Sequence, residues 1–147
     1  MTFADEKLKV LEHLPTVTPA QWGAFFGAFE KARNLGPGRM LGGEGVEKDG
    51  RMVFSMPFYA MTNEWISWEE AFYHQNIFCP IDWVSLREER YDGWLPSDAA
   101  EAVMALVVYI RRNRFAEGAL AGDIREGHVH HAMGLLQAAF GSPTSGD

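Results

Sequence analysis

The 147-residue sequence has a single cysteine, no apolar segment long enough to span a membrane, and fewer basic than acidic side chains. One cysteine excludes a disulfide within the chain, and this favours a reducing compartment. The longest apolar run, AVMALVVYI at 102–110, is about half the length that a bilayer requires. The first residues, MTFADEKLKV, lack the basic start and apolar stretch of a secretory signal. We therefore expect a cytoplasmic protein with no membrane partner.

Positive charge is scarce as well. Thirteen Lys and Arg side chains stand against 20 Asp and Glu, for a net charge of −7 at pH 7. Nucleic acids are bound largely through Lys and Arg groups that release counterions, so we expect no nucleic-acid partner. The cationic cluster of the sequence is Arg111, Arg112, Arg114 and Arg125. Because cations are favoured at helix C-termini, we interpret it as closing a helix, with an anion site as the alternative.

The composition is that of a folded protein, with 47% hydrophobic and 22% charged residues. A chain of this length can bury a sizeable core without a disulfide or a structural metal. We expect one globular domain at 1–140 and a flexible tail at 141–147, where small and polar residues predominate.

Helical periodicity runs through most of the chain. Trp22, Phe25, Phe26 and Phe29 follow the N-cap Thr18 at helical spacing and form one face, which predicts core rather than a ligand cage. The other expected helices are 4–14, 63–76, 98–112, 117–126 and 128–140. The helix at 98–112, with a capping box expected from Asp98 and Glu101, is apolar on most sides and should lie in the middle of the domain.

Residues 36–50, GPGRMLGGEGVEKDG, contain six glycines and cannot continue a helix. The KDG turn signal followed by the alternating RMVFSMPFY predicts a β-hairpin with strands near 40–47 and 51–59. Neither a dinucleotide nor a Walker spacing is present, so these glycines are interpreted as turn residues. The predicted fold class is α+β: a mainly helical single domain of about five to six helices with one small antiparallel hairpin. Residues 77–96, with two prolines and two tryptophans, are expected to be ordered but irregular.

Several stretches carry a resemblance to a known family. GGEGVEKDG leading to MPFY, then FYHQNIFCPIDW and RFAEGALAGDIREGHV, resemble a family of short bacterial proteins known only as a domain of unknown function. The likeness covers roughly 36–140, and its most telling element is Arg114-Phe115, Gly118, Leu120 and Gly127 in that order. It implies a bacterial, cytosolic single domain with this order of helices and hairpin. It assigns no catalytic residue, and the matched residues are those that would build a corner between helices.

Three histidines, His128, His130 and His131, lie within four positions. On a helical wheel His128 and His131 share the edge of the apolar face, about 60° apart, whereas His130 points into solvent. The two that could share a metal would need further ligands. Those considered are Asp123, His13 and His74. Because a structural zinc takes four ligands and a catalytic zinc three, we expect no metal and no cofactor.

Cys79 stands between His74 and Asp82 in the sequence. A thiol, a base and a carboxylate are the parts of a cysteine hydrolase. Isolated cysteines, however, are mostly buried and behave as small hydrophobes. Cys79 is therefore interpreted as core, and no catalytic residue is assigned.

Three functions are compatible with these observations. The favoured one is a non-catalytic binding or protein-interaction module, with a homodimer as one arrangement. It rests on Trp83, Tyr91 and Trp94, which lie among polar residues as in partner-binding surfaces. The least favoured is a DNA-binding helix-turn-helix at 117–140, because its last helix has no Lys or Arg to read the groove.

The intermediate hypothesis is a small-ligand protein or an enzyme, with a cleft between the hairpin and the central helix. The predicted polar wall of this cleft is Arg111, Arg114 and Glu117. The predicted acid–base candidates are His74 with Asp82 or Tyr59.

Overall fold

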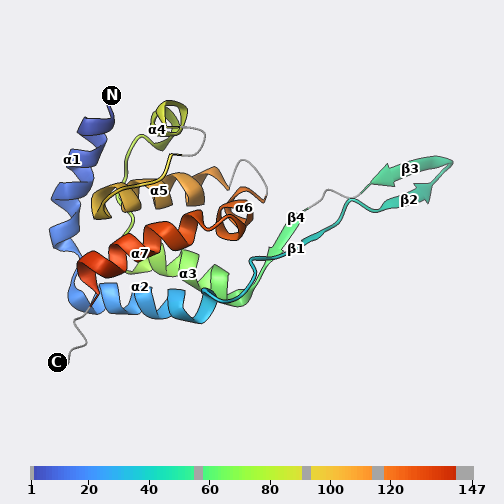
Figure 1. The fold of residues 1–147 in the computed structure, drawn as a ribbon. Coiled ribbons are helices and arrows are strands. Elements are labelled where there is room, and N and C mark those ends of the chain that lie inside the picture. Colours follow the sequence, from blue (N-terminus) through green and yellow to red (C-terminus); the bar gives the residue numbers. More distant parts are fainter. Residues whose placement is uncertain (1, 55–57, 91–93, 114–117, 142–147) are drawn as a thin grey trace.

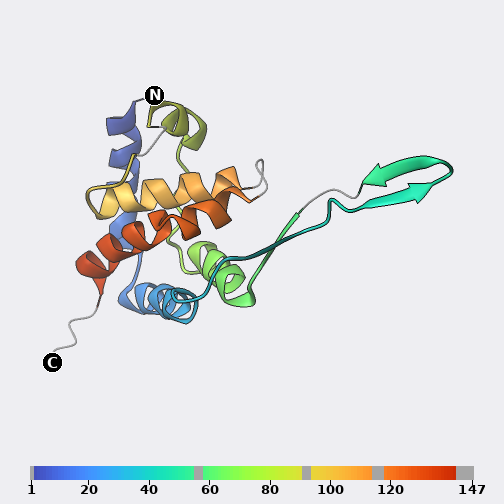
Figure 2. The ribbon, with the colours of Figure 1, turned by 45° about the vertical axis from the view of Figure 1, so that its right-hand side comes forward.

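A computed structural model of the chain describes residues 2–54, 58–90, 94–113 and 118–141. In them a helical body carries an antiparallel ribbon that projects from one end (Figures 1 and 2). The body holds a short 3-10 helix at Leu14–Thr16 and seven α-helices: α1 (Phe3–His13), α2 (Pro19–Ala32), α3 (Asn63–His74), α4 (Trp83–Glu89), α5 (Ala99–Arg112), α6 (Ala119–Arg125) and α7 (His128–Phe140). The mainly helical α+β class is confirmed, and none of the described helices is long and apolar enough to cross a membrane.

Helix α5 lies at the centre of the body, as its all-round apolar sequence predicts. It packs against α1, α4, α6 and α7, and every residue from Ala102 to Ile110 is buried. Helices α2 and α3 pack against each other, and α7 also contacts α2. The core therefore extends from α5 across α7 to the α2–α3 pair.

The aromatic face of α2 lies in this core. Trp22, Phe25 and Phe29 are buried, and the ring centroids of Phe25 and Trp68 are 5.9 Å apart. The N-cap predicted at Thr18 is present and forms a capping box, since the Thr18 hydroxyl accepts from the Gln21 N–H and the Gln21 side chain accepts from the Thr18 N–H. The cap at the start of α2 and the burial of its aromatic face are therefore both as the sequence pattern indicates.

Helix α4 was not expected, because residues 77–96 were predicted to be irregular. Asp82 caps the helix by accepting a hydrogen bond from the Ser85 N–H at 3.2 Å, and Leu86 is fully buried. The helix has only seven residues. Two turns supply too few apolar positions to produce a visible period, which is why the sequence pattern did not reveal it.

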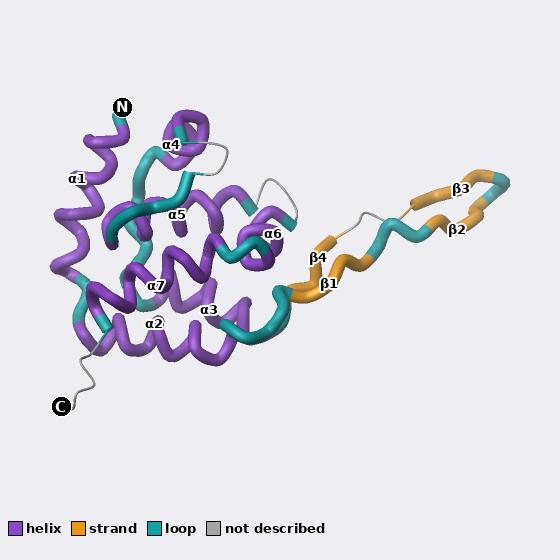
Figure 3. Tube along the Cα trace, viewed as in Figure 1, coloured by secondary structure: helices purple, strands orange, loops and turns teal. Residues whose placement is uncertain are grey.

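The ribbon consists of four short strands, β1 (Gly38–Leu41), β2 (Gly45–Lys48), β3 (Arg51–Phe54) and β4 (Phe58–Met61), and the other described elements are helices and loops (Figure 3). β1 pairs with β4 and β2 with β3, both antiparallel. The predicted KDG turn is present, with φ of 53° at Asp49 and 77° at Gly50. The hairpin is longer than predicted and divided in two.

The start of α6 lies at the base of this ribbon. Gly118 has φ of 85°, and a Cβ placed on it would lie 3.7 Å from side-chain atoms of both Met40 and Tyr59. The Tyr59 hydroxyl accepts a hydrogen bond from an Arg125 guanidinium N–H at 3.0 Å. The corner predicted around Gly118 therefore brings α6 against β1 and β4.

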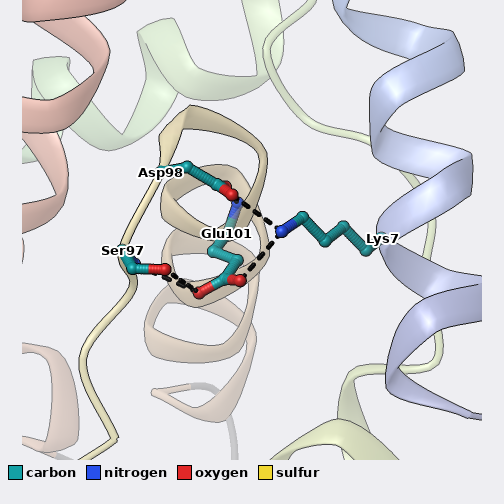
Figure 4. Close-up of polar contacts among 4 residues, drawn as sticks. All are labelled: Lys7, Ser97, Asp98 and Glu101. Carbon is teal, nitrogen blue, oxygen red and sulfur yellow. Dashed lines mark hydrogen bonds and ion pairs between the residues drawn. The ribbon is translucent and has the colours of Figure 1, made fainter.

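A polar clamp joins α1 to the start of α5 (Figure 4). Lys7 Nζ lies 2.7 Å from an Asp98 carboxylate oxygen and 2.9 Å from a Glu101 carboxylate oxygen. Asp98 accepts from the Glu101 N–H, as a cap should. The Glu101 carboxylate accepts from the Ser97 N–H and hydroxyl instead of the Asp98 N–H, so the predicted capping box is displaced by one residue.

We expect Lys7→Gln to lower the free energy of unfolding by about 1 kcal/mol at pH 7. Burial, the largest single cause, acts to raise the pKa of Asp98 and of Glu101, but the hydrogen bond from Lys7, the Lys7 charge and hydrogen bonds from neighbouring groups together outweigh it and lower both pKa values. The hydrogen bond to Asp98 in turn raises the pKa of Lys7. The stability from the clamp is therefore present above the ordinary carboxylate pKa, is lost as pH falls below about 4, and is lost again at alkaline pH as Lys7 deprotonates.

Urea unfolding at a series of pH values measures this effect. The matched control is Lys31→Gln, which removes an exposed lysine of α2. Its difference from the wild type should be small and independent of pH. A Lys7→Gln deficit that persisted unchanged at acid pH would contradict the prediction.

Candidate functional site

A pocket of about 270 Å³ lies beside α5. Helices α4, α5 and α6, the first residue of α7, and Trp94 line it. Its charged and ionisable wall residues are Arg87, Arg90, Arg112, Asp123, Glu126 and His128. In small-molecule sites such polar groups fix the orientation of a ligand, and the hollow is therefore the candidate site.

Asp123 holds the polar wall of this pocket together. It is 6% exposed, on the inward side of α6. One carboxylate oxygen accepts from an Arg112 N–H at 2.6 Å, and the other lies 3.1 Å from His128 Nδ1. A buried carboxylate requires such partners, because an unpaired charge would be costly to remove from water. The interaction connects the last turn of α5, the middle of α6 and the first turn of α7.

Tyr109 belongs to the same wall. It is 6% exposed, and its ring centroid lies 6.1 Å from that of His128. Burial, with a smaller contribution from the Asp123 charge, raises the pKa of Tyr109 to about 12. The phenol therefore keeps its proton at neutral pH. Within the described part of the chain, neither this hydroxyl nor Arg112 Nε has a hydrogen-bond partner.

The chemistry available here is recognition and proton exchange. A histidine whose Nδ1 is held by a carboxylate has the arrangement of a general base. The Nε2 atom of His128 lies 3.5 Å from a Glu126 carboxylate oxygen. None of the described lining residues is a serine, threonine or cysteine, so the described wall offers no acyl-transfer nucleophile.

Six of the eight ligand-binding residues predicted from the sequence lie within the described residues, and Arg114 and Glu117 lie outside them. Of the six, Trp94 lines the pocket. Trp83 is half-buried and packs against the core. The guanidinium of Arg111 lies over the Phe78 ring, 5.7 Å from its centroid.

The predicted acid–base candidates lie on three separate elements. His74 is exposed at the end of α3, Tyr59 lies on β4, and Asp82 caps α4. Hydrogen bonds from Ser85 lower the pKa of Asp82, whose own N–H donates to a Glu6 carboxylate oxygen at 2.7 Å. Asp82 is thus engaged at a helix start, and none of the three lines the pocket.

Cys79 is 4% exposed, and its Sγ lies 3.8 Å from the Lys9 carbonyl oxygen. Burial raises the pKa of its thiol. A protonated, buried thiol is a core group and a poor nucleophile. This agrees with the interpretation of Cys79 from the sequence.

The two histidines considered as metal ligands face different partners. His128 lies against Asp123, whereas His131 Nε2 lies 2.8 Å from the Pro96 carbonyl oxygen. Across the described ranges, no three His, Cys, Asp or Glu side chains are close enough to share an ion. The structure therefore places the two imidazoles in separate hydrogen bonds.

The prediction that His130 points into solvent was wrong. Its ring centroid lies 5.5 Å from that of Phe29 and 5.8 Å from that of Trp65. Its Nε2 lies 2.8 Å from the carbonyl oxygen of Arg33, at the C-terminal end of α2. Helix α7 contacts α2, so the polar side of its wheel meets a helix end whose carbonyls need donors.

Sequence reasoning missed Arg87, Arg90 and Tyr109 as site residues. It considered Asp123 only as a possible further ligand to a metal. One signal was available for Asp123. Leu120, Asp123 and Ile124 share one face of a short helix, and an acid on an apolar face needs a buried partner. No comparable pattern marks the two arginines, since α4 itself was not predicted.

Comparison with curated proteins and with solved structures gave no match. A family model described as "Family of unknown function (DUF6508)" matches residues 17–142. This range includes both the ribbon and every residue that lines the pocket. The resemblance to a domain of unknown function is thereby confirmed, and the chain belongs to the family of unknown function DUF6508.

Proposed function

We propose that this chain is a non-catalytic protein-interaction module that binds a second copy of itself through its ribbon. The observation that supports this most strongly is the exposure of apolar side chains on the outer strands, β2 and β3. Val46 is 65% exposed, Met52 58%, Val53 51% and Phe54 66%. Exposed apolar groups of this density usually belong to an interface.

Both faces of the outer ribbon carry exposed apolar side chains. Val46 is paired with Val53 in the register, so these two side chains share one face. Met52 and Phe54 lie on the other face, where a Cβ added to Gly45 would lie 2.8 Å from Met52 Sδ and 2.7 Å from Phe54 Cε1. The absence of a side chain at Gly45 makes room for this pair. A partner can therefore bury apolar area on either face.

A ribbon of two strands also has a physical need for a partner. Two-stranded hairpins are marginal in water, and three or more strands or a covering helix are needed for independent stability. The helical body lies at the far end of β1 and β4, away from β2 and β3, in both ribbon views (Figures 1 and 2). Pairing with another ribbon would satisfy strand edges and apolar faces together.

Charge favours a second copy as that partner. The whole chain carries −7, which opposes close approach of two bodies. Residues 38–61 are instead neutral, because three cations balance three anions. These are Arg39, Lys48 and Arg51 against Glu44, Glu47 and Asp49. Two ribbons can thus meet without net repulsion, and a two-fold arrangement is the commonest for such pairs.

The test is sedimentation equilibrium of the wild type and of the double variant Val53→Lys/Phe54→Lys. We expect a dimeric mass for the wild type at about 100 µM and a monomeric mass for the variant, since lysines disfavour edge and face pairing. Leu8→Lys is the matched control, because Leu8 on α1 is 55% exposed and lies on the body. It should remain dimeric. A monomeric wild type, or a double variant that stays dimeric, would overturn the proposal.

The basis for this proposal differs from the one suggested by the sequence. Trp94 contacts Phe3 edge to face at 5.8 Å, and Trp83 packs against the core, so these rings serve the fold. Tyr91 lies outside the described residues. The ribbon replaces the segment 77–96 as the proposed binding element. A cytoplasmic location and a single domain over 1–140 remain part of the proposal, and the protonated buried thiol of Cys79 is compatible with that location.

A further inference from the structure

The pocket beside α5 is lined by more positively charged side chains than its acidic side chains can pair with. Both oxygens of Asp123 are already engaged by Arg112 and His128. The Glu126 side chain is 70% exposed and lies at the rim. Arg87 and Arg90 form no ion pair with any described acid, and the Arg90 guanidinium lies over the Phe3 ring, 3.9 Å from its centroid. In a chain of net charge −7, this leaves a local excess of guanidinium groups around one hollow.

The unsatisfied groups in the wall need an acceptor. Arg112 Nε and the Tyr109 hydroxyl are buried polar atoms without a partner among the described residues. Arg112 Nε can only donate a hydrogen bond, and the protonated Tyr109 hydroxyl can donate one to an oxygen. Leaving a buried donor without an acceptor is unfavourable, because the donor has lost its hydrogen bond to water. An anion with two or more oxygens would complement these donors and the arginines together.

The remaining wall is apolar and the space is small. Leu86, Val108 and Trp94 contribute carbon surface to the lining. A volume of about 270 Å³ lies just below the usual range for small-molecule sites, so the space is small even for one ligand. The cavity suits a compact molecule with one charged end and one apolar end.

We propose that this pocket binds a small organic anion, a carboxylate or phosphate monoester with a planar apolar body. Arg87 and Arg90 draw the anionic head, Arg112 and Tyr109 donate to its oxygens, and Trp94 with Leu86 flanks the body. Asp123 and His128 position Arg112. This site lies in the helical body and is independent of the association proposed through the ribbon.

The test is NMR titration of the tryptophan indole N–H signals with three probes: phenyl phosphate, benzoate and inorganic phosphate. We expect saturable shifts of the Trp94 signal with a dissociation constant of about 1 mM for phenyl phosphate or benzoate, and weaker binding of inorganic phosphate. The stronger of the two organic probes identifies the head group. Equal binding of inorganic phosphate would overturn the apolar part of the proposal, and no saturable shift with any probe would overturn all of it.

Two variants assign the contacts. Arg87→Gln should weaken binding of the better probe about tenfold, because it removes one charge-assisted contact. Arg39→Gln, on β1, is the matched control and should bind as the wild type does. Tyr109→Phe removes only the hydroxyl and should weaken binding several-fold while the fold is retained. An Arg87→Gln variant with wild-type affinity would contradict the site even if the tyrosine variant failed to fold.

Discussion

Replacing Trp65 with alanine is expected to lower the free energy of unfolding by about 4 kcal/mol, the largest effect of any change considered for this protein. Trp65 is fully buried between α2, α3 and α7. Its ring centroid lies 5.4 Å from that of Trp68 and 5.8 Å from that of His130. Alanine would leave a cavity that three helices cannot all close.

The indole also makes a specific hydrogen bond. Trp65 Nε1–H donates to the Leu35 carbonyl oxygen at 3.0 Å, at the point where the chain leaves α2 for the ribbon. Trp65→Phe retains most of the ring and loses this bond. We therefore expect it to cost about 1–2 kcal/mol, well below the alanine variant.

Thermal and urea unfolding would measure both variants. For a chain of this size, the alanine variant should melt about 12 °C lower than the wild type. Trp94→Ala is the control for loss of an indole, since Trp94 is half-buried and should cost less than half as much. A Trp65→Ala loss under about 1.5 kcal/mol would mean that the packing around α3 differs from that described.

Asp123→Ala should have the second largest effect, a loss of about 3 kcal/mol. The change removes the partner of Arg112, whose side chain is only 23% exposed, and the acceptor beside His128. A guanidinium left without its carboxylate in a partly buried site is strongly unfavourable, although access to water lessens the penalty. Helices α5, α6 and α7 would lose their common polar contact.

The neighbouring acid of the same pocket supplies the control. Glu126 has a side chain that is 70% exposed, so Glu126→Ala should change the unfolding free energy by no more than about 0.5 kcal/mol. Asp123→Asn, which keeps the shape and one acceptor oxygen, should fall between the two. If urea unfolding gave equal losses of unfolding free energy for Asp123→Ala and Glu126→Ala, the Arg112–Asp123 pair would add no stability beyond that of an exposed acid.

Much of the fold could be predicted because its signals are local. Thr18 and Gln21 cap α2 through groups three positions apart, and Asp49-Gly50 adopts the turn that its residues favour. Because the sequence of α5 is apolar on most sides of the helix, its central position could be predicted. The two failures have different causes. Helix α4 is too short to show a period, and the wheel for α7 could not include the end of α2 that meets His130.

The candidate site was less accessible to sequence reasoning. Arg87, Tyr109 and Asp123 each look ordinary in their own segment. Their significance arises from α4, α5 and α6 surrounding one space, which depends on contacts between positions far apart in the chain. For the expected acid–base group the opposite holds. His74, Asp82 and Tyr59 have suitable side chains for proton transfer, but the fold places them on three different elements.

The sequence alone determined most of the helical segments, where they begin, and that a hairpin turns at Asp49-Gly50, because capping, period and turn chemistry act within a few residues. Only the tertiary structure decided that the ribbon projects from the body and that Arg112, Asp123 and His128 meet. Those outcomes follow from how whole helices pack, where small changes in crossing angle or corner geometry decide which side chains approach each other.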